Sequence, residues 1–175
     1  TSALVITHIG WANLITTLTC AAPPCTYNWT MPSTLLSNNV RTKVELVGDT
    51  THVKDESLSA FEVKGSLTTI APNSTQYWMV GELKNISWIS NPTSQGSVRI
   101  VYSLDGVAYP ESAPDQKVTP TDVLSSTSPY SWTVPSAAIG ETVYFRVYRV
   151  LDPTVKIENT TPIKVYNLSV NALPA

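Results

Sequence analysis

The strings YNWTMPS at residues 27–33 and YSWTVPS at residues 130–136 decide the fold, because they indicate that the chain contains one unit twice. When the sequence is shifted against itself by 103 positions, residues 27–47 align with residues 130–150, and eight of the 21 pairs are identical. Average amino-acid usage gives only about one or two identities over that length. The two strings therefore mark equivalent places in two copies of a repeat.

The length of the repeat indicates which kind of structural unit is repeated. The alignment continues after a one-residue deletion, with residues 53–65 on 155–167, so that the period is about 100 residues. Solenoid repeats have periods of ~20–50 residues, whereas ~100 residues is the size of an independent β-sandwich domain. We expect one complete unit over residues 72–175, ending at the start of a next one. Residues 1–71 would be the later part of a preceding unit.

Apolar and polar residues alternate along the candidate strands, which is typical of antiparallel sheets with one solvated face. In the string VRIVYS, for example, Val98, Ile100 and Tyr102 are expected to point inward, with Arg99 and Ser103 outward. The same pattern places other residues inward, namely Ile86, Trp88, Val143, Phe145 and Val147, and in the first unit Val40, Val44 and Leu46. It places a matching set outward, namely Asn85, Ser87, Tyr144, Arg146 and Tyr148, and in the first unit Arg41, Lys43 and Glu45. No segment has a helical period.

The repeated strings themselves are predicted to be the ends of inner strands. Tyr27 and Trp29, like Tyr130 and Trp132, share one strand face and would be large core residues. The proline that follows each pair lacks an N–H group and would end the strand pairing.

The composition excludes several classes of function. Only 14% of the residues are charged and the net charge is −2. The 11 basic residues are scattered, whereas a nucleic-acid partner requires clustered Lys and Arg. No stretch approaches the ~20 apolar residues of a membrane span, so we expect no direct membrane insertion.

The two cysteines, Cys20 and Cys25, are separated by four residues. This spacing favours a disulfide that closes a small loop, and a disulfide implies an oxidising compartment. A zinc site is disfavoured because it needs about four ligands and the nearest histidine, His8, stands alone. Two free thiols are the alternative.

Five asparagines lie in N-x-S/T sequons and are candidates for glycosylation: Asn28, Asn73, Asn85, Asn159 and Asn167. Asn28 and Asn85 are predicted on outward strand faces, and Asn73 and Asn159 in loops. Asn167 shares the inward parity of Ile163 and Val165, which makes it the poorest candidate. A chance occurrence in a chain rich in Ser and Thr is the alternative.

No catalytic, cofactor or metal constellation is recognisable. His8 and His52 belong to different strands and do not recur in the second unit. Single acids such as Asp55, Glu56 and Asp105 are better explained by turn chemistry than by calcium binding. Among the aromatic residues, the outward Tyr144 and Tyr148 are the only candidates for a sugar-stacking surface. We therefore expect no enzyme.

An ordered set of motifs resembles one group of bacterial secreted immunoglobulin-like tandem repeats. It runs from PNSTQYWMVGELKNISW at residue 72 through VRIVYSLDG and YSWTVP to a Val-rich strand that contains Arg. A more distant similarity is to the N-terminal domain of Ser/Thr-rich, GPI-anchored fungal wall proteins. The resemblance implies tandem immunoglobulin-like or fibronectin-III-like sandwiches without enzymatic activity. One departure is DGVAYP, where Tyr109 stands near the position of a usual Trp.

The first unit has no counterpart of residues 72–94, which hold two opening strands. We expect either that the native chain continues upstream, which we favour, or that a neighbouring molecule donates the strands. The leading functional hypothesis is a structural repeat of a large surface, S-layer-like or fibre protein. Its partners would be neighbouring repeats or other copies of the surface protein. The alternatives are an adhesin-like module that binds glycans or surfaces, and a filament subunit completed by strand donation.

Overall fold

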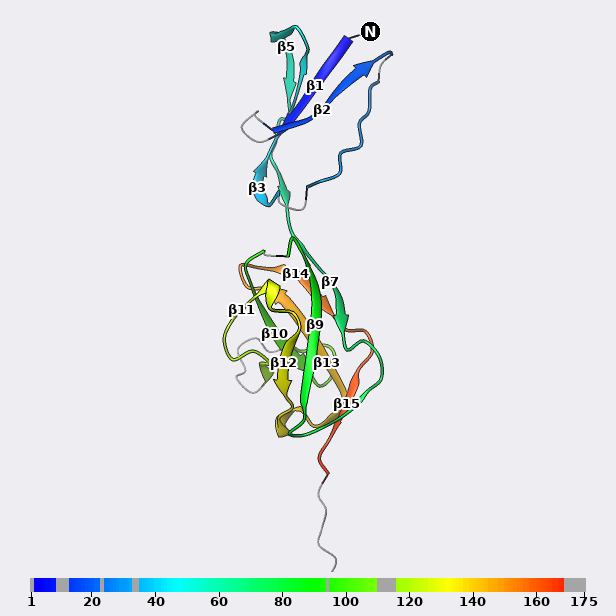
Figure 1. The fold of residues 1–175 in the computed structure, drawn as a ribbon, viewed down its shortest axis with the longest axis vertical. Helices are drawn as coiled ribbons and strands as arrows, with labels where there is room; N and C mark the ends of the chain where they lie inside the picture. The colour runs from blue at the N-terminus through cyan, green and yellow to red at the C-terminus, as the bar shows by residue number, and fades with distance from the viewer. Residues whose placement is uncertain are drawn as a thin grey trace, which may run out of the picture. The chain divides into compact units, whose positions relative to one another are not determined.

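A computed structural model describes residues 2–8, 13–22, 24–32, 35–93, 95–109 and 116–168. Within these ranges the protein is all-β, and its only helical turns are short 3-10 segments. The chain divides into two compact units, Thr1–Lys64 (unit 1) and Gly65–Ala175 (unit 2), which we describe separately (Figure 1).

Unit 2 contains two sheets. The three-stranded sheet has the order β12 (Tyr130–Thr133), β9 (Leu83–Asn91), β7 (Ser66–Ala71). The six-stranded sheet has the order β11 (Val123–Leu124), β10 (Ser97–Ser103), β13 (Gly140–Arg149), β15 (Ile163–Tyr166), β8 (Tyr77–Met79), and β14 (Asp152–Glu158) also pairs with β13. Strands β8 and β15 run parallel, and the other pairs in this unit are antiparallel.

The two sheets of unit 2 share one aromatic core, which makes the unit a β-sandwich. Trp132 of β12 packs edge-on against Phe145 of β13 at 5.5 Å between ring centroids, and its ring lies 5.6 Å from that of Tyr102. Such ring pairs each contribute about 0.5–1.5 kcal/mol beyond the burial of their area. Trp88 is also buried, and its indole N–H donates to the Ser125 carbonyl at 2.9 Å. The predicted core positions of these four residues are confirmed.

Two residues predicted to face solvent, Ser103 and Tyr148, are buried instead. Tyr148 is only 2% exposed and forms a second small cluster with Val101 and Tyr109 on the other face of the β10–β13 ladder. The alternation rule assumes that this face is wet, but the segment that follows β10 folds over it and brings Tyr109 onto it. The same segment covers Ser103, whose hydroxyl is used in the turn after β10.

Unit 1 also contains two sheets. The four-stranded sheet has the order β2 (Asn13–Cys20), β1 (Ser2–His8), β4 (Thr42–Leu46), β5 (Asp49–Glu56). The two-stranded sheet pairs β3 (Ser37–Val40) with β6 (Phe61–Val63). Among the side chains described in this unit, Val40 is the one fully buried hydrophobic residue. Lys43 and Glu45, expected to face solvent, form an ion pair of 2.9 Å and are only 11% and 14% exposed.

The β1–β4 ladder of unit 1 matches the β10–β13 ladder of unit 2 residue by residue. Ile6 pairs with Val44 across β1 and β4, and Ile100 pairs with Val147 across β10 and β13. In the sequence, residues 3–10 (ALVITHIG) align with residues 97–104 (SVRIVYSL), so Ile6 is equivalent to Ile100, as Val44 is to Val147. Each pair of the β1–β4 ladder has such a counterpart in the β10–β13 ladder, which has one further pair, Ser103–Tyr144.

Register irregularities recur at equivalent places as well. The β4–β5 ladder shifts register between Glu45 and Leu46, and the β13–β14 ladder shifts between Tyr148 and Arg149. The pairs Ser37–Val63 and Val40–Phe61 of β3 and β6 correspond to Gly140–Val165 and Val143–Ile163 of β13 and β15. The sequence repeat is therefore accompanied by equal strand pairing.

The repeated string itself behaves differently in the two units. Residues 130–133 form β12 and pair with residues 83–86 of β9. Residues 25–32 form no strand (Figure 1) and Tyr27 is 45% exposed, so the prediction that Tyr27 lies in a core is wrong. The physical reason is that unit 1 has, among its described residues, no strand in the place of β9 to which this segment could pair.

The structure places the boundary between the two units after Lys64. This is seven residues before the boundary between residues 71 and 72 that the sequence predicts. Strand β7, which the sequence places with the first unit, pairs with β9 in unit 2. Gly65, the first residue of unit 2, has no room for a Cβ atom. The Gln95 side-chain oxygen and, at 3.1 Å, the Asn91 carbonyl oxygen occupy that space.

We predict that the two equivalent tryptophans differ in their contribution to stability. Trp132→Ala removes a buried ring from the core of unit 2 and is expected to lower the free energy of unfolding of that unit by about 3–5 kcal/mol. Trp29→Ala is the matched control in unit 1 and should cost less than half as much, because Trp29 is only half-buried. Urea denaturation followed by peptide-resolved hydrogen exchange measures each unit. Equal losses for the two variants would contradict this assignment of the cores.

Candidate functional site

The described residues contain no group of three or more His, Cys, Asp or Glu side chains placed to hold a metal ion. His52 lies beside Asp49 on β5, with 2.9 Å between Nδ1 and Oδ1, and the His52 side chain is 80% exposed. The side chain of His8 lies outside the described residues. The candidate functional features are therefore a disulfide loop, surface asparagines and exposed apolar surfaces.

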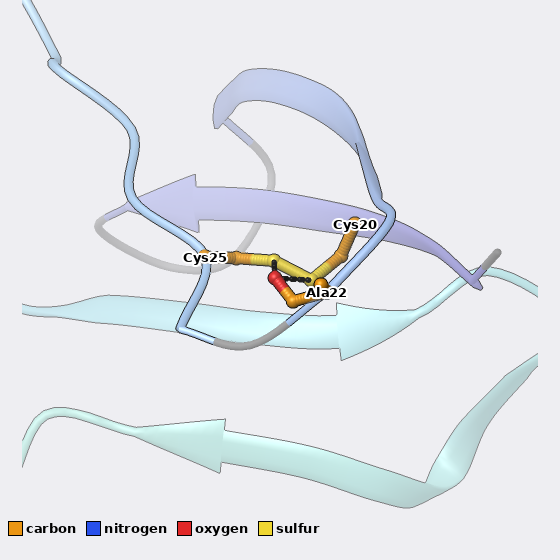
Figure 2. The surroundings of a disulfide bond; sticks show 3 residues. All are labelled: Cys20, Ala22 and Cys25. Carbon is orange, nitrogen blue, oxygen red and sulfur yellow. Dashed lines mark hydrogen bonds between the residues drawn. A yellow bond between two sulfur atoms is a disulfide. The ribbon is translucent and has the colours of Figure 1, made fainter.

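Cys20 and Cys25 form a disulfide that closes the loop after β2, with Cα atoms 6.0 Å apart (Figure 2). The carbonyl oxygen of Ala22 points toward the two sulfur atoms, 3.7 Å from that of Cys20 and 3.5 Å from that of Cys25. Closure of so small a loop stabilises the folded chain by about 2 kcal/mol in the chain-entropy model. The bond indicates folding in an oxidising compartment, and it fixes the start of the segment that leads to Tyr27.

Asp105 organises the turn after β10, as expected for a turn residue. Its carboxylate accepts hydrogen bonds from the Ser103 hydroxyl at 2.7 Å and from the backbone N–H groups of Val107 and Ala108 at 2.8 and 2.9 Å. The Ser103 bond, followed by these backbone bonds, lowers the pKa of Asp105 to about 2. The next residue, Gly106, has a positive φ of 73°, and a Cβ atom there would lie 3.0 Å from the Tyr144 ring. The turn thus places the following segment over the β10–β13 ladder.

The segment after this turn contains a buried tyrosine, Tyr109. The guanidinium carbon of Arg146 lies 3.8 Å from the centroid of the Tyr109 ring, and Arg146 also pairs with Glu158 at 2.8 Å. Burial, followed by the nearby charge of Glu158, raises the pKa of Tyr109 to about 12. Because Tyr148 is buried in the same cluster, the predicted sugar-stacking pair of Tyr144 and Tyr148 is not available as an exposed surface.

The five sequons divide into four exposed asparagines and one buried one. The exposed ones are Asn28, Asn73, Asn85 and Asn167. The predicted inward direction of Asn167 is wrong. Strand β15 ends at Tyr166, so the alternation of the strand no longer applies at residue 167, which is exposed. Asn159 lies in the loop after β14, as predicted, but it is only 3% exposed, which disfavours it as a glycan acceptor.

Asn159 is held by the fold through both ends of its amide. Its side-chain oxygen accepts a hydrogen bond from the Phe145 N–H at 2.5 Å, and its side-chain nitrogen donates to the Thr161 carbonyl at 2.6 Å. The side-chain oxygen of Asn73 accepts from the N–H groups of Thr160 and Thr161, at 2.8 and 3.1 Å. Asn159 thus anchors the corner between β14 and β15, and a glycan on its nitrogen is incompatible with the folded unit.

An exposed tyrosine pair lies at the edge of the six-stranded sheet. Tyr77 of β8 and Tyr166 of β15 are stacked, with centroids 6.2 Å apart and ring planes 13° apart. Tyr77 is 67% exposed, and Met79 next to it is 43% exposed. Sequence reasoning missed this pair, because the two tyrosines are brought together by a parallel pairing between the first and last parts of the unit.

Two apolar residues of unit 1, Val53 and Met31, are far more exposed than their equivalents in unit 2. Val53 is 48% exposed, whereas its equivalent in unit 2, Val155, is 7% exposed. Met31 is 42% exposed and its equivalent Val134 is 1% exposed. A hollow between β4 and β5 is lined by Val44, Leu46 and Val53 together with the charged residues Glu45, Lys54 and Asp55. Equivalent positions thus form a core in one unit and a surface in the other.

No family model matches the chain, and no curated protein matches it. Within the described parts of the chain, we find no helix with the length and apolar character needed to cross a bilayer.

We predict that Asn159 is a structural residue rather than a glycosylation site. Asn159→Ala leaves the Phe145 N–H buried without a partner and should lower the free energy of unfolding of unit 2 by about 1–3 kcal/mol. Asn85→Ala is the matched control at an exposed sequon and should change it by less than about 0.5 kcal/mol. Urea denaturation measures both, and peptide mapping of protein secreted from a eukaryotic host should find residue 159 unmodified. A glycan on residue 159 of the folded protein would refute the assignment.

We also predict an acid-dependent contribution from Asp105. The folded pKa of about 2 lies below the unfolded value, which is about 3.9. The ionised Asp105 carboxylate therefore contributes fully to the free energy of unfolding when the pH is above the unfolded pKa. This contribution is lost as the pH falls through the folded pKa of about 2. Asp105→Ala should lower the melting temperature at pH 6, and the difference from the unmodified chain should shrink toward pH 2. A difference that is independent of pH would contradict the role of the carboxylate.

Proposed function

We propose that this chain is a structural module of a large extracellular surface protein, built from immunoglobulin-like sandwiches in tandem. The single observation that carries the proposal is the equivalence of the two units in strand pairing. Three ladders and two register irregularities recur at aligned residues. A sandwich of two sheets and about 100 residues is the usual size of an immunoglobulin-like domain.

The polar chemistry is consistent with a structural role outside the cell. The disulfide indicates an oxidising compartment. The hydrogen bonds of Asp105 serve a turn, and those of Asn159 and Asn73 serve the corner between β14 and β15. The resemblance of the motifs to secreted bacterial repeats supports the same role.

The proposal is tested on the intact protein from its source. Antibodies raised against the 175-residue chain would be used to isolate the native polypeptide, whose length and sequence are then determined. We expect further units that carry the Y-x-W-T-x-P-S string. A mature protein that consists of residues 1–175 alone would overturn the tandem array.

A second candidate function, binding to glycans at a surface, is favoured by the exposed stack of Tyr77 and Tyr166. Tyrosine faces offer an apolar surface with a polar edge, which suits a sugar ring. Binding on a glycan array that is lost in Tyr77→Ala and kept in Tyr144→Ala would favour this function over the structural one.

A further inference from the structure

We propose that Asn85 carries an N-linked glycan, and that this glycan covers two exposed apolar side chains beside it, Leu83 and Ile89, on the outer face of the three-stranded sheet. The proposal rests on the extracellular location in the proposed function, because N-linked sugars are attached to secreted chains. It does not depend on the tandem array.

The outer face of the three-stranded sheet carries no charged side chain. Strands β12, β9 and β7 lie side by side in this order (Figure 1), and their outward residues alternate with buried ones. Lys84, the one charged residue within these three strands, has the opposite parity, and its ammonium lies 5.9 Å from the ring centroid of the core residue Trp78. The outward residues are all uncharged: Ser66, Thr68, Ala71, Leu83, Asn85, Ser87, Ile89, Asn91, Ser131 and Thr133.

Two large apolar side chains are exposed on this uncharged face. Leu83 is 68% exposed and Ile89 is 55% exposed. Strand residues of the six-stranded sheet instead form ion pairs at its surface, namely Arg99–Asp122, Arg146–Glu158 and Lys164–Glu141. Exposed apolar side chains on a face without charge favour association with other molecules. A covalently attached glycan removes this tendency, because it is bulky and solubilising.

Asn85 lies between the two apolar side chains and begins a complete sequon, Asn85-Ile86-Ser87. Residues two apart in a strand point to the same side of the sheet, so that Leu83, Asn85, Ser87 and Ile89 form one row. At about 3.3 Å per residue, Leu83 lies ~7 Å and Ile89 ~13 Å from Asn85 along the strand. A glycan of several sugar rings reaches both.

The hydrogen bonding of Asn85 leaves its side-chain nitrogen available. The side-chain oxygen accepts a hydrogen bond from the Ser131 hydroxyl of β12 at 2.9 Å. Within the described parts of the chain, the nitrogen donates to no protein group. Asn159 is the opposite case, because its nitrogen donates to the Thr161 carbonyl and the residue is buried. Asn85 therefore has the exposed nitrogen that a glycan requires.

The modification is the transfer of a sugar from a lipid-linked diphosphate donor by a transferase of the secretory route. The anomeric carbon of the first sugar breaks its bond to a phosphate oxygen and forms a bond to the Asn85 side-chain nitrogen. That nitrogen loses one proton, and the lipid diphosphate leaves with the electron pair of the broken bond. No oxidant or reductant takes part.

The site is tested on the 175-residue chain secreted from a eukaryotic host and on the native protein from its source. Peptides are mapped by mass spectrometry before and after treatment with a peptide N-glycosidase. We expect a glycan at residue 85 and none at residue 159. Ser87→Ala should abolish the glycan at residue 85, whereas Ser87→Thr, the matched control that retains a sequon, should keep it. An unmodified Asn85 in either protein would overturn the site.

The covering of Leu83 and Ile89 has a separate readout. We expect Ser87→Ala to bind more of the apolar-surface dye ANS than Ser87→Thr, and this excess to be lost when Leu83 and Ile89 are also replaced by Ser. The unsubstituted chain from a host without the transferase is a second glycan-free reference, and it should bind as much dye as Ser87→Ala. Equal dye binding with and without the glycan would overturn the covering role.

The outcomes for the glycan and for the tandem array are distinguishable. A glycan-free Asn85 would leave the tandem-array proposal intact, because that proposal depends only on the sequence of the native protein. A native protein without further units would overturn the array and leave the assignment of Asn85 unchanged.

Discussion

The pairing of β12 with β9 is the interaction on which the rest of unit 2 depends. It brings Trp132 against Phe145 and Tyr102, and these rings join the two sheets into one core. The backbone of β12 has a partner only because β9 is present. In unit 1, whose described residues include no strand in the place of β9, the similar string at residues 27–33 forms no strand over its described part, and Tyr27 is exposed. Similar local sequence therefore gives different local structure, because strand formation is a property of the pair.

Much of the fold could be predicted from the sequence. The period of about 100 residues and the alternation along residues 98–102 and 143–147 predict antiparallel sheets, and the structure is all-β with these residues in its ladders. The buried positions of Trp88, Trp132 and Phe145 also follow from their parity within a strand. These predictions succeed because they depend on the period of two that every strand shares.

The failures lie where contacts are made between segments that are distant in sequence. Tyr148 has outward parity, but a loop anchored by Asp105 and Gly106 carries Tyr109 onto it. Asn159 stands in a loop, but its amide bridges two backbone segments and is buried. The exposed stack of Tyr77 and Tyr166 requires parallel pairing of strands β8 and β15, which no local sequence pattern predicts. Each of these features depends on tertiary packing, which overrides the local period.

The central claim is that residues 27–30 and 130–133 are equivalent segments, of which only the second forms a strand in the described parts of the chain. Amide hydrogen exchange of the unmodified chain tests this claim most directly, because it compares the two segments in one experiment. We predict that the amides of β12 that face β9 exchange only through large-scale unfolding of unit 2, and that the amides of residues 27–30, which lie outside any strand, exchange much faster. Equal protection of the two segments would contradict the account.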